Sequence, residues 1–129
     1  MSQEAETIKS FTDLDAWREA HALAVMIYKA TKHFPKEETF ALTSQIRRAA
    51  TSVSANIAEG FSRKTSADRE HFYTMSLGSL TELQSHLMIS RDVGYMILDD
   101  FKLVSTQSIK VHKILTGLIR ATKQRSSRS

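Results

Sequence analysis

Apolar side chains recur at alternating spacings of three and four along most of the chain, which is the period of an α-helix that buries one face. The pattern predicts four helices, at about residues 13–33, 39–60, 66–93 and 99–122. The predicted apolar stripes consist of Trp17, Ala20, Ala24, Ile27, Thr31 and Phe34; Leu42, Ile46, Ala49, Val53 and Ile57; Phe72, Ser76, Leu80, Leu83 and Leu87; and Val104, Ser108, Val111, Leu115, Leu118 and Thr122.

Helix-breaking and capping residues separate the four stretches. Pro35 is the one proline and fixes the entry to the second helix. Gly60 has the position of a C-cap at the end of that helix. Short polar residues or glycine mark the other ends, namely Asp13 or Asp15, Thr65 or Ser66, Gly94 and Asp99.

The second helix is predicted to be the central one, because its side chains are short and it offers two faces for contact, an apolar stripe and an outer face of small residues. A polar row beside its stripe, with one residue of the third helix, is expected to form a structural network that fixes register, or alternatively a ligand site: Gln45, Arg48, Asn56, Glu59 and Glu82. The first helix also has apolar residues outside its stripe, which predict a second contact face: Leu23, Val25 and Met26. Gly78, on the outer face of the third helix, is expected to allow a close backbone contact.

Long helices with short connections predict an all-α protein, an antiparallel up-down-up-down four-helix bundle. We expect residues 1–12 to be a disordered N-terminal segment, residues 13–122 to form the bundle, and residues 123–129 to be a basic, disordered tail. Small residues on the outer face of the second helix predict a close contact, either with a neighbouring helix or with another subunit of a homo-oligomer, which a closed ring would bury on every subunit.

Composition limits the class of protein. The 129-residue chain has no cysteine, which excludes disulfides and thiolate metal sites. Its longest apolar run is too short to span a bilayer, and its start is polar and acidic, so we expect a cytoplasmic protein without membrane contact. The net charge is +4, and all acidic residues lie at or before Asp100, which leaves the last quarter of the chain basic.

Several motifs carry a family resemblance: LDAW at 14–17, FPKEE at 34–38, LTSQIRRAA at 42–50, NIAEG at 56–60 and GSLTEL at 78–83. With them, residues 11–122 resemble the four-helix-bundle proteins encoded in intervening sequences of bacterial large-subunit ribosomal RNA genes. The resemblance implies an up-down bundle, a ring that is a pentamer, and an unestablished biochemical function. More distantly, the group is similar to the basic accessory protein of diversity-generating retroelements, which binds nucleic acid and a reverse transcriptase.

No catalytic set can be assembled from the residues. A di-iron bundle needs Glu-x-x-His on two helices, and that spacing is missing. No arginine has the following histidine of helical-bundle ribonucleases, and no serine lies in a glycine-rich elbow. We therefore predict a non-enzyme with no cofactor and no metal.

The basic residues are the remaining functional candidates. They could neutralise nucleic-acid phosphates, or they could form an ordinary solvated face. The candidate nucleic-acid-binding residues are Lys110, Lys113, Arg120, Lys123, Arg125, Arg128, Arg63 and Lys64.

Two functions follow. The first is an oligomeric scaffold that associates with itself and binds RNA or DNA through backbone electrostatics, without sequence readout. The alternative is a protein–protein interaction module whose partner is another protein and whose charge serves solubility only. Binding to nucleic acid should fall steeply with salt, whereas recognition of an apolar helix face should not.

Overall fold

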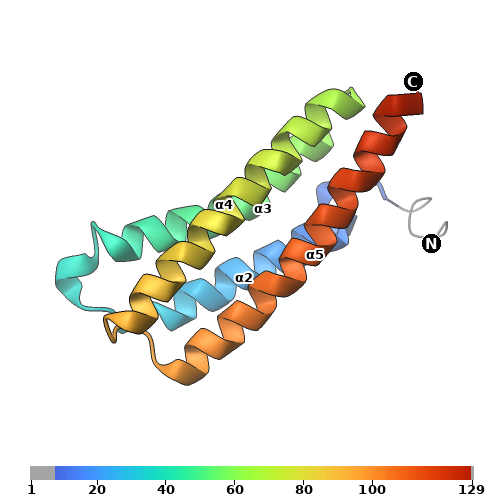
Figure 1. Ribbon diagram of the computed structural model, residues 1–129. Helices are drawn as coiled ribbons and strands as arrows, with labels where there is room; N and C mark the ends of the chain where they lie inside the picture. Colours follow the sequence, from blue (N-terminus) through green and yellow to red (C-terminus); the bar gives the residue numbers. More distant parts are fainter. Residues whose placement is uncertain (1–7, 129) are drawn as a thin grey trace.

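The computed structural model describes residues 8–128; residues 1–7 and 129, and the side chains of 127 and 128, lie outside that description. The described chain forms four α-helices, two short 3-10 helices and no strand, so the predicted all-α class is confirmed (Figure 1). The elements are η1 (Phe11–Asp13), α2 (Asp15–Ala30), η2 (Lys36–Glu38), α3 (Leu42–Ser62), α4 (Ser66–Asp92) and α5 (Leu98–Arg128).

Each long helix packs against its neighbours in the chain, and α2 also packs against α5, which closes the cross-section. The C-terminus and the α3–α4 connection lie at one end, and the α2–α3 and α4–α5 connections lie at the other (Figure 1). Side-chain contacts agree with this placement. Lys123 of α5 pairs with Glu70 of α4 at the first end. Tyr95 bonds Glu38 at the second.

The predicted stripes form most of the core. Their fully buried members are Ala20, Ile27, Ile46, Val53, Ile57, Leu80, Leu83, Val104, Val111 and Leu115. Trp17, Leu42 and Leu118 pack at its margin, half-buried. A periodicity of three and four therefore identifies the buried face of every helix.

Two core assignments are wrong. Leu23, predicted to be surplus surface, is fully buried. This follows from the position of α2, which packs against both α3 and α5 and so buries a wider stripe. Tyr73, rather than its neighbour Phe72, fills the core side of α4 and is only 2% exposed.

Gly60 explains the position of Tyr73. A Cβ atom at residue 60 would lie 2.7 Å from Cε1 of Tyr73, so the ring occupies the space that a larger residue on α3 would need. Gly60 is consequently buried inside α3 rather than at its C-cap, which is Arg63. Gly78 has no atom within 4 Å of a Cβ built on it, so the predicted close contact is absent within the described chain.

Several predicted caps differ from the structure. The N-cap of α2 is Leu14, because Asp13 belongs to η1 and closes a capping box with Ser10. Thr65 is confirmed as the N-cap of α4, since its hydroxyl accepts a hydrogen bond from the Asp68 amide at 3.1 Å. Asp99 lies within the first turn of α5 instead of capping it. Gly94, with φ of 82°, follows α4 as predicted.

The structure describes part of each segment that was predicted to be disordered. Residues 8–10 lead into η1, which continues from residue 11, while residues 1–7 lie outside the described chain. At the other end, α5 continues through residues 123–128, so the prediction of a disordered tail is wrong there. Lysine, glutamine and arginine are good helix formers, and neither glycine nor proline interrupts this stretch.

Candidate functional site

Ion pairs occupy several of the candidate nucleic-acid-binding residues. Lys110 Nζ lies 3.3 Å from Glu19 Oε1 of α2, and Lys123 Nζ lies 3.7 Å from Glu70 Oε2 of α4. Arg63 pairs with Glu59 at 2.8 Å. The positive charge of each of these three side chains is therefore partly neutralised by a carboxylate of the same bundle.

The other candidate cations are distributed along the bundle. Lys113 and Arg120 are exposed on the outer side of α5, and Lys64 is exposed in the α3–α4 connection. None of these three has an ion pair among the described residues. Arg125 lines a pocket at the end of the bundle. The side chain of Arg128 lies outside the described residues. The eight candidates thus do not form one patch.

The predicted polar network around Arg48 exists in part, but on the surface. Arg48 lies 3.8 Å from Glu82 and donates a weak hydrogen bond to Gln45 at 3.5 Å. Its side chain is 68% exposed and that of Glu82 is 42% exposed. The expectation of charge near the core is therefore wrong, because the seam between α3 and α4 leaves these long side chains in solvent.

The rest of the network separates into small groups. Asn56 donates to the Ser52 carbonyl at 3.0 Å, and the Ser52 and Ser79 hydroxyls are 2.8 Å apart across α3 and α4. Glu59 bonds Arg63 of its own helix instead of Arg48. The serine pair and the Arg48–Glu82 pair connect the two helices beside this row, and in the core the Ser76 hydroxyl donates to the Val53 carbonyl at 2.6 Å.

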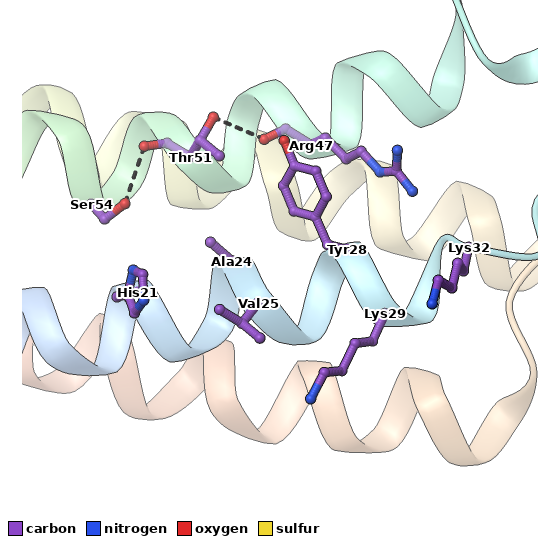
Figure 2. Close-up of a pocket in the computed structure, with 9 residues that line it drawn as sticks. All are labelled: His21, Ala24, Val25, Tyr28, Lys29, Lys32, Arg47, Thr51 and Ser54. Carbon is purple, nitrogen blue, oxygen red and sulfur yellow. Dashed lines mark hydrogen bonds between the residues drawn. The ribbon is translucent and has the colours of Figure 1, made fainter.

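A groove of about 490 Å³ lies between α2 and α3 (Figure 2). Its floor includes Val25 and Tyr28, both exposed. The basic side chains of Lys29, Lys32 and Arg47 surround it together with His21, and no carboxylate of the described residues lines it. The groove therefore offers apolar surface within a positive rim.

Arg47 is held in place at the rim of this groove. Its Nε donates a hydrogen bond to Thr31 Oγ1 at 3.0 Å. Its guanidinium carbon lies 4.7 Å from the centre of the Tyr28 ring, a cation–π distance. Arg47 was not among the predicted site residues, because the groove depends on two helices at once. The off-stripe position of Val25 was the available signal.

A second apolar surface lies between α4 and α5. A shallow groove of about 220 Å³ there exposes Met88 and Ile109, with Phe101 beside them under the Arg91 guanidinium. The α2/α3 and α4/α5 grooves share no helix. In a closed cross-section of four helices they therefore lie on opposite faces.

Metal and membrane chemistry find no support within residues 8–128. No group of three or more His, Asp or Glu side chains there is arranged to hold a metal ion. No helix in that range is long and apolar enough to cross a bilayer. Glu82 and His86 do approach, with Oε2 and Nε2 3.2 Å apart, but the other charged neighbour of Glu82 is the Arg48 guanidinium, which is not a metal ligand.

These features define a four-helix, all-α protein with apolar grooves on opposite faces. The chain belongs to the 23S rRNA-intervening sequence protein family, whose model matches residues 12–117, so the family resemblance is confirmed. Among solved structures it is similar to a Bacteroides thetaiotaomicron protein of the S23 ribosomal protein family, itself described as of unknown function. That pair has 24% sequence identity and a TM-score of 0.75, over 81% of this chain and 95% of the other, a likeness of fold. No curated protein matches.

Proposed function

We propose that this protein is a non-enzymatic scaffold whose subunits, up-down-up-down bundles, assemble head to tail into a homo-oligomeric ring. The observation that supports it is the pair of apolar grooves on opposite faces. If the α2/α3 groove of one subunit receives the α4/α5 face of the next, the contact repeats and closes. The proposed number of subunits in the ring, five, rests on the family resemblance.

The exposed apolar side chains make such a contact favourable. Val25 and Tyr28 on one face, and Met88 and Ile109 on the other, are each about half exposed in the isolated chain. Burying a large apolar side chain fully contributes roughly 1.5–3 kcal/mol relative to leaving it exposed. A closed ring gains this on both faces of every subunit.

Light scattering coupled to gel filtration tests the assembly. We expect the native protein to have the mass of several chains at micromolar concentration. Val25→Glu and Ile109→Glu each place a charge in one of the two grooves and should lower that mass. The matched control is Ser85→Glu, an exposed position on α4 that lines neither groove. A single-chain mass for the native protein would contradict the proposal.

A second function, binding of RNA or DNA by the ring, is supported by the line of cations on α5. Lys102, Lys113 and Arg120 are separated by three and two helical turns and so share the outward side. None of them is ion-paired within residues 8–128. Repeated around a ring, this line would present phosphate-binding charge several times over.

Salt titration separates this function from the alternative, a protein-interaction module without nucleic-acid binding. Each phosphate neutralised on duplex DNA contributes about 0.9 to the slope of log affinity against log salt. The double variant Lys113→Gln, Arg120→Gln should flatten that slope. Lys110→Gln is the control, since Lys110 already pairs with Glu19. No binding to RNA or duplex DNA at low salt would favour the alternative.

A further inference from the structure

A pocket of about 330 Å³ lies at the end of the bundle where α5 passes the ends of α3 and α4. Its walls are largely apolar and include Leu14, Phe61 and Leu118. Two guanidinium groups and one phenol also line it: Arg69, Arg125 and Tyr73. No carboxylate of residues 8–128 lines the pocket, so the polar side formed by these residues presents hydrogen-bond donors and positive charge.

Tyr73 is the unusual member of this pocket. Its side chain is almost completely buried, yet its hydroxyl has no hydrogen-bond partner among the described residues. The nearby Thr122 hydroxyl is already engaged, since it donates to the Leu118 carbonyl at 2.8 Å. The hydroxyl is not one of the fully buried polar atoms that lack a partner, which are Thr43 Oγ1 and His86 Nδ1, so it is accessible from the pocket and can donate there to a ligand.

Arg69 is fixed beside the hydroxyl. Its Nε donates to the Arg63 carbonyl at 2.7 Å, and its guanidinium carbon lies 5.4 Å from the centre of the Phe61 ring. These contacts use one N–H and one face of the guanidinium and leave its terminal nitrogens for a ligand. Arg125, across the pocket, adds a second positive charge.

The protonation of Tyr73 suits the role of donor. Burial raises the pKa of the phenol above 10.0, and the positive charges of Arg69 and Arg125 oppose that shift. The hydroxyl therefore keeps its proton at neutral pH and offers it to an acceptor. An anion gains most, because a hydrogen bond to a charged acceptor is stronger than one to a neutral acceptor.

We propose that this pocket binds the carboxylate of a small organic acid, with the Tyr73 hydroxyl and the Arg69 guanidinium on the anion and the apolar walls around its hydrocarbon body. A guanidinium matches the two oxygens of a carboxylate in one plane. A single negative charge also costs less to move between apolar walls than the higher charge of a phosphate. The volume suits a compact ligand.

Nuclear magnetic resonance titration of the full chain tests the site with a matched pair of probes. The pair is 3-phenylpropionate and its neutral amide, 3-phenylpropionamide. We expect saturable shifts at Tyr73 and Leu118 with the acid, and affinity for the amide weaker by roughly tenfold or more. Inorganic phosphate, added as a third probe, should not displace the acid.

Variants assign the effect to the pocket. Tyr73→Phe keeps the ring and removes only an unpartnered hydroxyl, so it should fold normally and bind the acid roughly tenfold more weakly. Arg69→Gln should have a similar effect. Lys113→Gln removes the same charge from an exposed position outside the pocket and is the control.

Four outcomes would overturn the proposal, three of which concern the acid itself. They are equal affinity for acid and amide, unchanged affinity of Tyr73→Phe for the acid, and no saturable shift through the millimolar range. Competition by inorganic phosphate at equal strength would also overturn it, because the site would then be a general anion site. The assembly is measured separately by light scattering, so the ring and this pocket can fail independently.

Discussion

At the end of the bundle where α3 meets α4, the prominent side chains are cations, whereas at the other end they are apolar. The first, here the cationic end, carries Arg63, Lys64, Arg69, Lys123 and Arg125. The second, here the apolar end, exposes Phe40, Ile89, Val93, Ile97 and Leu98, with Phe40 97% exposed. Both ends are built from short connections between the same long helices.

The apolar end has two layers. Inside, Phe34 and Tyr95 pack with their ring centres 5.8 Å apart, and Met96 is only 4% exposed. The Tyr95 hydroxyl donates to Glu38 Oε2 at 3.1 Å and joins the two connections. Because this inner layer already closes the core, the exposed Ile97 and Phe40 are surface beyond what folding requires, which is typical of a contact with another protein.

The cationic end is organised around a pocket instead of a seal. Glu59 and Glu70 offset Arg63 and Lys123, but Lys64 and Arg69 have no carboxylate partner among the described residues. The Tyr73 ring fills the space beside Gly60, and Tyr73 also lines the pocket. The two ends of one bundle therefore differ in chemistry. Exposed apolar side chains gather at one end and basic side chains at the other, a bundle length away.

The largest expected effect contrasts adjacent residues at the apolar end. Met96→Ala removes a buried side chain from the inner layer and should lower the free energy of unfolding by about 2–4 kcal/mol. Ile97→Ala removes an exposed one and should change it by about 0.5 kcal/mol or less. Chemical denaturation measures both. Equal losses would mean that the apolar end has one layer, not two.

Gly60 provides the corresponding test at the cationic end. Gly60→Val forces side-chain atoms into the Tyr73 ring and should cost about 1–3 kcal/mol by overpacking. Gly78→Ala is the matched change on an open helix surface and should stabilise the protein by up to about 1 kcal/mol. Chemical denaturation reports both changes as shifts of the midpoint, provided that the dependence of the unfolding free energy on denaturant concentration stays the same. A neutral Gly60→Val would show that Tyr73 is not confined by α3.

Removing one hydroxyl at each end compares the two tyrosines directly. Tyr95→Phe deletes the hydrogen bond to Glu38 and should cost about 1 kcal/mol. Tyr73→Phe deletes a hydroxyl without a partner and should leave the free energy of unfolding unchanged or slightly higher. The same denaturation experiment compares them. A larger loss for Tyr73→Phe would reveal an acceptor in the free protein.

The smallest expected effects concern the titration of these tyrosines. The Glu38 hydrogen bond raises the pKa of Tyr95, and burial raises the pKa of Tyr73, both from 10.0. Each folded phenol holds its proton more tightly than the unfolded one. This stabilisation is therefore fully present below pH 10.0 and is lost as the pH rises through the folded values.

Ultraviolet titration of phenolate absorbance distinguishes the two causes. Glu38→Gln should lower the pKa of Tyr95 toward 10.0 by removing its charged partner. Arg69→Gln should raise the pKa of Tyr73 further, because the guanidinium favours the phenolate. Shifts in the opposite directions would contradict the stated causes.

The sequence predicted the four helices and most of the core, because a buried face leaves a period of three and four. It assigned Phe72 to the stripe of α4, which was wrong, since Tyr73 occupies the core position. The choice between the two depends on Gly60, on another helix. Arg48 was misplaced for a related reason. Periodicity places a residue beside a stripe but does not show how far the neighbouring helix covers it.

The candidate sites were less predictable than the fold. Cations can be counted in a sequence, but their partners cannot, and Lys110 is paired with a residue of α2 far away in the chain. The grooves and the Tyr73 pocket each need side chains from at least two helices. Only the off-stripe position of Val25 gave a sign of the α2/α3 groove.

The contact between α2 and α5 also bears on how the chain reaches this structure. The Gln107 amide donates to the Glu19 carbonyl and to Glu19 Oε1, both at 2.9 Å, across 88 residues of sequence. The other extensive helix contacts join consecutive helices, which meet early because the loops between them are short. We therefore expect hairpins to form first, and the docking of the first long helix onto the last to limit the folding rate.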